Sequence, residues 1–216
     1  MRAIRNFTFA CALTTPALAE PVTVVALGDS LTAGYGLPQE DGFVPQLQAW
    51  LTAQGQDVVV VNAGVSGDTT AGGLARLDWS LTPDVDAMIV TLGGNDLLRG
   101  IDPAASRANL DAILKRAGER NLPVLLVAMA APGNYGPDYK RDFDAIYPEL
   151  ATQYGTLLAP GFFSALTGGD TDPAAIAAYI QPDGLHPNAE GVAVIVEGLG
   201  PMVQELIERV PESFGR

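Results

Sequence analysis

The sequence predicts a three-layer α/β/α sandwich built on a five-stranded parallel sheet. Short apolar runs alternate with longer segments of helical period, which is the order of elements that parallel sheets require. The runs are continuous stretches of Val, Ile and Leu, which is typical of strands covered by helices on both faces. No repeat, linker or low-complexity tract interrupts residues 22–207, so we expect a single domain over residues 20–216.

Five apolar runs are the predicted strands of this sheet. Their ranges in chain order are 22–27, 58–61, 87–92, 124–128 and 156–158. Turn-forming residues flank them, as Asp57 and Asn62 flank the second run. The run at 156–158 is the shortest and therefore the weakest signal.

Two helices between these strands are marked by spacing and by caps. In residues 42–54 the apolar side chains Phe43, Leu47, Trp50 and Leu51 recur at helical spacing. Asp102 is a favourable N-cap and Pro103 suits the first helical position, so the sequence predicts another helix that begins there. Leu110, Ile113, Leu114 and Ala117 form its apolar face.

The last helix is predicted to begin at Ala189, after an N-cap at Asn188. It contains glycines and a proline, at Gly198, Gly200 and Pro201. Because both residue types weaken helices, we expect a bend or a break there, before Leu206.

Residues 1–19 have the layout of a secretory signal peptide. Arg2 and Arg5 are followed by the apolar stretch 7–13, and residues 17–19 read Ala-Leu-Ala. The stretch is too short to span a bilayer. We expect cleavage after Ala19, which removes Cys11, the only cysteine, and gives a periplasmic or secreted protein. Cys11 is not at the cleavage point, so we expect no lipid anchor and no stable membrane attachment.

Charge and histidine content exclude several classes of function. The chain has 25 acidic and 12 basic residues and a net charge of -13, which disfavours nucleic acids and anionic lipids as partners. His186 is the only histidine, so a zinc site built on several imidazoles is impossible. We expect no metal and no cofactor, a small-molecule substrate and a monomer.

Glycine-rich polar clusters follow three of the predicted strands, and a fourth precedes the last helix. They span residues 28–30, 64–68, 93–96 and 183–187. Each one alone could be a tight turn or a helix cap. Because ligands of parallel sheets bind at the carboxyl ends of the strands, the clusters together predict a functional site at one edge of the sheet.

Ser30, His186 and Asp183 have the chemistry of a nucleophile, its base and the residue that orients the base. A serine hydroxyl is a weak nucleophile until a base accepts its proton, and His186 is the only imidazole. Asp183 lies three residues earlier and can accept the Nδ1 proton of that imidazole. The Asn95 side chain and the Gly67 backbone amide could stabilise an oxyanion.

Other assignments of these residues are open at this stage. The G-x-S-x-G motif of the α/β-hydrolases is absent around Ser30. Ser66, which lies in a similar loop, is a rival nucleophile. Asp29, Asp68 and Asp96 could bind magnesium in a metal-dependent phosphoryl hydrolase. An inactive binding module on the same scaffold is a third possibility.

As a set, the four clusters resemble the Ser, Gly, Asn and His blocks of the SGNH hydrolases, the GDSL family. The matching stretches are 28–31, 63–69, 93–96 and 183–187. Further stretches at 72–77, 92–100, 132–136 and 146–148 resemble the bacterial periplasmic group of arylesterases, acyl-CoA thioesterases and lysophospholipases. The resemblance implies the flavodoxin-like SGNH fold and hydrolysis of esters or thioesters through an acyl-serine.

The same resemblance implies a role for each block residue. It makes Ser30 the nucleophile, His186 the base and Asp183 its orienting partner. The oxyanion donors would be the backbone amides of Ser30 and Gly67 and the side chain of Asn95. A lysophospholipase or a carbohydrate O-acetylesterase could use the same residues.

The segment after the fourth predicted strand is the candidate acyl-binding loop. Residues 129–132 continue an apolar strand into a loop with few charges, which favours an acyl chain over a sugar. The candidate contacts are Met129, Pro132, Asn134 and Tyr135, and we expect the loop 129–137 to set the preferred chain length. The alternative is that Met129 and its neighbours only pack against the end of the sheet.

Overall fold

The computed structural model describes residues 20–168 and 176–211, so the predicted signal peptide lies outside the described residues. A five-stranded parallel sheet has the order β2-β1-β3-β4-β5. Its strands are β1 (Val22–Gly28), β2 (Val58–Gly64), β3 (Ala87–Thr91), β4 (Val124–Val127) and β5 (Leu157–Ala159). All five predicted strands are present, and β2 runs three residues further than its apolar run, so the predicted fold class is confirmed.

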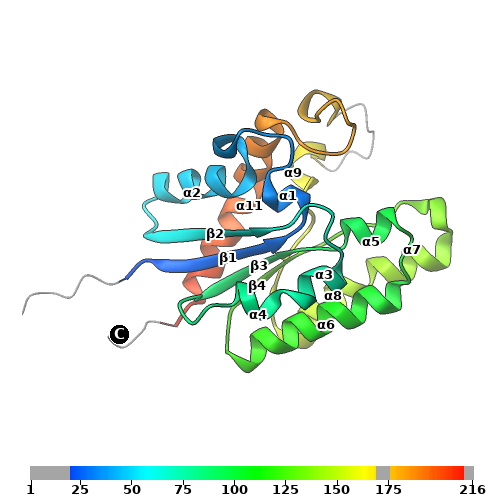
Figure 1. The fold of residues 1–216 in the computed structure, drawn as a ribbon, viewed down its shortest axis with the longest axis horizontal. Helices are drawn as coiled ribbons and strands as arrows, with labels where there is room; N and C mark the ends of the chain where they lie inside the picture. The colour runs from blue at the N-terminus through cyan, green and yellow to red at the C-terminus, as the bar shows by residue number, and fades with distance from the viewer. Residues whose placement is uncertain (1–19, 169–175, 212–216) are drawn as a thin grey trace, which may run out of the picture.

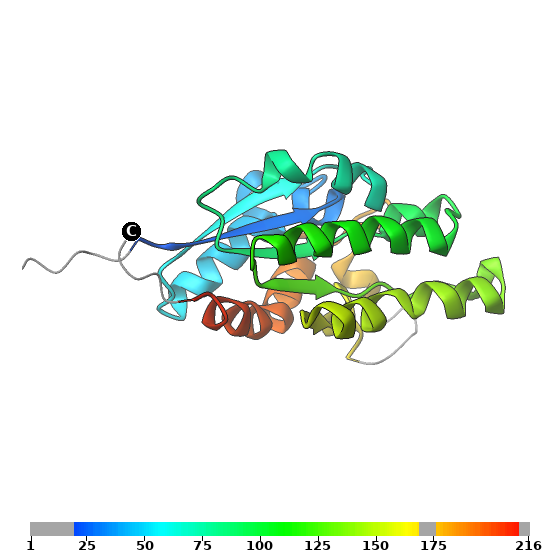
Figure 2. The ribbon, with the colours of Figure 1, turned by 90° about the horizontal axis from the view of Figure 1, so that it is seen from below.

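Helices cover both faces of the sheet (Figures 1 and 2). The helices on one face are α2 (Phe43–Ala53), α9 (Ser164–Thr167) and α11 (Ala189–Glu208). The opposite face packs against α4 (Leu77–Ser80), α6 (Pro103–Glu119), α7 (Pro137–Asp144) and α8 (Ile146–Tyr154). Side chains of β1 alternate between the two cores, with Val24 and Ala26 in the first and Val25 and Leu27 in the second.

The prediction that both faces are covered is wrong for the edge strand β2. Val59 is 43% exposed and Val61 is 41% exposed, although both lie in a continuous apolar run. The outer edge of β2 is partly covered by a side chain of α2. Gln48 accepts a hydrogen bond from Val60 N (2.8 Å) and donates one to the Val58 carbonyl (2.9 Å). Such capping occupies backbone groups that would otherwise be open to another strand.

The break that was one predicted outcome for the last helix is absent, since α11 continues from Ala189 to Glu208. Its start is as predicted, because the Asn188 side chain accepts a hydrogen bond from Gly191 N (2.9 Å). A Cβ atom on Gly200 would lie 2.7 Å from the Trp50 ring, and one on Gly198 would lie 2.5 Å from the Ala165 Cβ. The two glycines therefore permit close packing against α2 and α9, and this packing outweighs their low helix propensity.

Short helices at the carboxyl edge of the sheet were not predicted. They are α1 (Ser30–Ala33), α3 (Thr70–Ala75) and α5 (Gly94–Leu98). Three 3-10 turns, η1 (Gln39–Asp41), η2 (Gly133–Tyr135) and η3 (Ala177–Tyr179), complete the described elements. Among the described residues no helix is both long and apolar enough to cross a membrane.

Candidate active site

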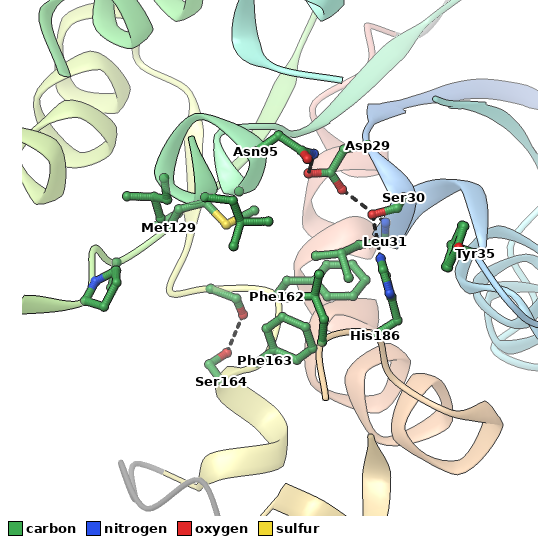
Figure 3. A pocket seen from close by; sticks show the side chains of 18 of the residues that line it. Asp29, Ser30, Leu31, Tyr35, Asn95, Met129, Phe162, Phe163, Ser164 and His186 are labelled. Carbon is green, nitrogen blue, oxygen red and sulfur yellow. Dashed lines mark hydrogen bonds between the residues drawn. The ribbon is translucent and has the colours of Figure 1, made fainter. Parts of the chain in front are cut away.

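Ser30 is the first residue of α1, directly after the carboxyl end of β1. Asp29 is the N-cap of this helix, and its Oδ1 accepts a hydrogen bond from Leu31 N (3.0 Å). The Oγ of Ser30 lies 2.9 Å from the Nε2 of His186, as Figure 3 shows. The fold thus brings together two residues that lie 156 positions apart in the chain.

Asp183 holds the other side of the His186 imidazole. Its Oδ2 lies 2.6 Å from Nδ1, and its Oδ1 accepts hydrogen bonds from the backbone amides of Leu185 (2.9 Å) and His186 (3.0 Å). These hydrogen bonds, that of the His186 side chain first, lower the pKa of Asp183 to about 2. The carboxylate is therefore ionised at neutral pH and can fix the tautomer in which Nε2 accepts a proton.

The His186 loop is held by neighbours on two sides. The backbone amide of Gln181 donates to the His186 carbonyl (2.7 Å), and Ile180 forms a bridge with Pro187. The ring of Tyr35 lies against the imidazole, with a centroid distance of 4.6 Å. His186 is 9% exposed, so its ring is largely enclosed, with its Nε2 directed at Ser30.

Asn95 lies in the first turn of α5, which follows β3, and Gly67 lies in the loop that follows β2. The Asn95 Nδ2 donates to the Asp68 carbonyl (2.9 Å) and to Asp29 Oδ2 (3.3 Å). Gly67 has a φ of +84°, a left-handed conformation that favours glycine. Ser30, Gly67 and Asn95 all line one pocket, so the three candidate oxyanion donors are brought together.

Asp29 is a buried carboxyl group inside this site, with 2% of its surface exposed. Burial raises its pKa to about 6, although the Leu31 amide, His186 and Asn95 each favour the charged form. Its position on the opposite side of Ser30 from the imidazole means that it does not compete with Asp183 for His186 (Figure 3).

The pocket that opens beside Ser30 has a volume of about 700 Å³. All four candidate substrate contacts, Met129, Pro132, Asn134 and Tyr135, line it. Opposite them lies a wall that sequence reasoning missed, formed by Pro160, Gly161, Phe162, Phe163 and Ser164 after β5. These residues follow a strand end as the other clusters do, but the fifth predicted strand spans only 156–158 and is therefore a weak signal in the sequence.

Leu31, Leu97, Leu98 and Leu185 also belong to the apolar part of this lining. Leu31 comes from the nucleophile turn itself, and Leu185 precedes His186. The lining is mostly apolar, although Asn134, Ser164 and Thr167 also belong to it.

The rival assignments of these residues find less support in the geometry. Ser66 lines the pocket, but the His186 Nε2 lies within hydrogen-bond distance of Ser30 Oγ. Asp96 is buried and accepts hydrogen bonds from Thr70 N (2.8 Å), Thr70 Oγ1 (2.6 Å) and Ser106 Oγ (2.9 Å). Within residues 20–168 and 176–211, no three acidic or histidine side chains are grouped as a metal site would need.

The sequence profile of the GDSL-like lipase/acylhydrolase family matches residues 26–194, which contain every residue of this site. The chain belongs to the GDSL-like lipase/acylhydrolase family. It is thus a hydrolase, and the resemblance to the SGNH hydrolases that the motif blocks indicated is confirmed.

Several named proteins are similar to this chain over most of its length. Esterase TesA of Pseudomonas aeruginosa is 38% identical over 86% of this chain and 89% of its own. Thioesterase 1/protease 1/lysophospholipase L1 of Escherichia coli is 35% identical over 86% of this chain and 85% of its own. The crystal structure of AlinE4, an SGNH-hydrolase family esterase, is 42% identical with a TM-score of 0.70, and the match covers 88% of this chain and 98% of AlinE4.

Proposed function

We propose that this enzyme hydrolyses carboxylic esters or thioesters of small aryl and acyl substrates through an acyl intermediate on Ser30. The observation that carries the proposal is the hydrogen-bonded series Asp183–His186–Ser30, with distances of 2.6 Å and 2.9 Å, at the edge of an apolar pocket. A nucleophile, a base and an orienting carboxylate in this arrangement are the requirements of acyl transfer.

The first half of the reaction forms the acyl-serine. His186 Nε2 accepts the Ser30 proton as Oγ attacks the carbonyl carbon, and the carbonyl oxygen becomes an oxyanion. The backbone amides of Ser30 and Gly67 stabilise that negative charge, together with Asn95 Nδ2, which exchanges its longer hydrogen bond to Asp29 Oδ2 (3.3 Å) for one to the oxyanion. His186 then returns the proton to the departing alcohol or thiol, which leaves the acyl group on Ser30.

The second half repeats these steps with water. His186 accepts a proton from the water molecule, and the resulting hydroxide attacks the acyl carbonyl. The second oxyanion accepts hydrogen bonds from the same donors. Collapse of this intermediate breaks the bond to Ser30, whose Oγ takes the proton back from His186. The products are a carboxylic acid and the free enzyme.

The pocket lining supports an acyl chain as the group that it holds. Met129, Phe163 and Leu31 lie around the space beside Ser30, whereas a sugar site would need several hydrogen-bonding side chains. A single-chain lipid such as a lysophospholipid therefore suits the site better than an acetylated sugar. The names of the relatives, an esterase and a thioesterase that is also a lysophospholipase, agree with this range.

The Ser30→Ala variant tests the proposal directly. We expect it to lose p-nitrophenyl acetate hydrolysis by about 10⁴-fold or more, as nucleophile removal does in other serine hydrolases. We expect Ser66→Ala, which alters another hydroxyl of the same pocket, to keep most of the activity and to react with a fluorophosphonate. Wild-type turnover in Ser30→Ala, or loss of activity in Ser66→Ala alone, would contradict the assignment.

Export and a monomeric state are further parts of the proposal. The layout of residues 1–19 supports secretion into the periplasm or the medium with cleavage after Ala19. Mass spectrometry of the exported protein should give an N-terminus at Glu20, and light scattering should give the mass of one chain. An intact N-terminus at Met1 would contradict export by this route.

A further inference from the structure

Arg76 lies at the C-terminal end of α3 and makes three hydrogen bonds, to the ends of β1 and β2 and to the loop that follows β2. Its Nη2 donates to the Gly28 carbonyl (2.8 Å) and its Nη1 to the Ala63 carbonyl (2.7 Å). Its Nε donates to Asp68 Oδ2 at 2.5 Å. The side chains of Arg76 and Asp68 are only 21% and 17% exposed, so this ion pair is largely shielded from solvent.

The three acceptors belong to the two segments that present backbone oxyanion donors. Gly28 is the last residue of β1, two positions before Ser30. Ala63 is near the end of β2, and Asp68 directly follows Gly67. One guanidinium group therefore fixes the Ser30 turn relative to the Gly67 loop.

The third donor, the Asn95 side chain, is linked to the guanidinium group of Arg76 through Asp68. The backbone carbonyl of Asp68 accepts a hydrogen bond from Asn95 Nδ2 (2.9 Å), while its carboxylate binds Arg76. Displacement of Asp68 would thus move the amide of Asn95 as well as the peptide of Gly67.

Close packing of α3 makes this arrangement possible. A Cβ atom on Gly72 would lie 2.4 Å from Asp68 Oδ1, so only a glycine leaves room for the carboxylate between α3 and the loop. The planar fork of arginine can serve two carbonyls and a carboxylate at once, whereas the ammonium group of a lysine is a compact point charge on a flexible stem.

From this geometry we infer that Arg76 is a positioning residue for the oxyanion hole, which it holds together through Gly28, Ala63 and Asp68. The inference rests on the proposed function, because it assumes that Ser30, Gly67 and Asn95 stabilise an oxyanion. Arg76 does not line the pocket, so it acts through these residues and not on the substrate.

The test compares Arg76→Lys with a matched control, Arg120→Lys. Arg120 also donates from its two terminal nitrogens to backbone carbonyls, those of Leu81 and Thr82, but in the loop that leads into β3 at the opposite end of the sheet. Active sites are counted with a fluorophosphonate, and kcat is expressed per labelled site. We expect Arg76→Lys to lower kcat about 10- to 100-fold with little change in KM, since a small displacement of catalytic donors has effects of that order.

A thionoester gives a readout that simple destabilisation would not change. Replacement of the carbonyl oxygen by sulfur weakens the hydrogen bonds of the oxyanion hole, so the wild-type enzyme should strongly prefer the oxygen ester. We expect this preference to shrink in Arg76→Lys and to stay at the wild-type value in Arg120→Lys. Asp68→Asn, which keeps the shape of the side chain but not its charge, should change the preference in the same direction and also serves if Arg76→Lys does not fold.

The outcomes distinguish this inference from the proposed function. An unchanged kcat per labelled site and an unchanged ester preference in Arg76→Lys and Asp68→Asn would overturn the role of Arg76. If Ser30→Ala is inactive in the same experiment, the acyl-serine mechanism stands regardless. If Ser30→Ala is active, the proposed function itself fails.

Discussion

The buried Asp29 carboxylate contacts the amide of Asn95, with Oδ2 and Nδ2 3.3 Å apart, so an ionisable group that the triad does not include lies against a candidate oxyanion donor. Burial raises the pKa of Asp29 to about 6 from the ordinary value of 3.8. The folded state therefore holds a proton on Asp29 over a pH range in which the unfolded chain has released it.

This shift predicts a pH-dependent stability difference between the wild type and Asp29→Asn. As the pH rises from about 4 to 6, the free energy of unfolding of the wild type falls, because ionisation of the buried carboxyl is disfavoured. The difference between a pKa of 3.8 and one of about 6 corresponds to a loss of up to about 3 kcal/mol, at 1.36 kcal/mol per pH unit. Asparagine does not titrate, so urea unfolding should show the variant gaining stability relative to the wild type between pH 4 and pH 7. A stability difference that stays the same from pH 4 to pH 7 would contradict the raised pKa. Altered contacts with Asn95 would only add a constant amount to the pH-dependent difference.

Asp183→Asn should lower kcat by about 10³- to 10⁴-fold, because an amide at this position favours the wrong imidazole tautomer. The pKa of Asp183 is lowered to about 2, so the carboxylate stays ionised throughout the range in which histidines titrate. The acid limb of the kcat/KM profile should therefore contain no step from Asp183, although the buried Asp29, with its pKa raised to about 6, titrates within this limb. A step that Asp183→Asn removes near pH 4, or a flat rate from acid to alkaline pH, would contradict these roles.

Asn95→Ala should leave a weak but measurable esterase. Loss of one oxyanion donor costs about 10²- to 10³-fold in kcat, while substrate binding in the apolar pocket is retained and KM changes little. The natural comparison is Ser30→Ala, which should be far less active on p-nitrophenyl acetate. Equal activities of Asn95→Ala and the wild type would remove Asn95 from the oxyanion hole.

Chain-length preference should depend on residues from both walls of the pocket. Met129→Ala and Phe163→Ala each enlarge the space beside Ser30, so the optimum in a p-nitrophenyl ester series should move to longer acyl chains. Met202→Ala is the control, because Met202 packs against the core on α11 and does not line the pocket. An unchanged profile in Met129→Ala would favour the alternative that this residue only packs against the end of the sheet.

Most of the sheet could be predicted because its signals are local. Apolar runs mark the strands, and Asp102 and Asn188 cap helices as expected, with the Asp102 carboxylate accepting a hydrogen bond from Ala104 N (2.9 Å). The exposure of Val59 and Val61 could not be predicted, since it depends on which strand lies at the edge. The continuity of α11 through Gly200 could not be predicted either, because the contact of Gly200 with Trp50 is not local in sequence.

The sequence alone determined which groups are available for chemistry: one imidazole, no zinc site built on histidines, and Ser30, Gly67, Asn95 and Asp183 in polar clusters. Local signals sufficed there, because each cluster follows a strand or precedes a helix. The tertiary structure decided which of these groups lie against one another. It also decided that residues 160–164 form a wall of the pocket, that Asp29 is buried and that Arg76 makes three hydrogen bonds. Those features arise from the side-by-side order of parallel strands, which joins residues far apart in the chain and sets their solvation and their pKa values.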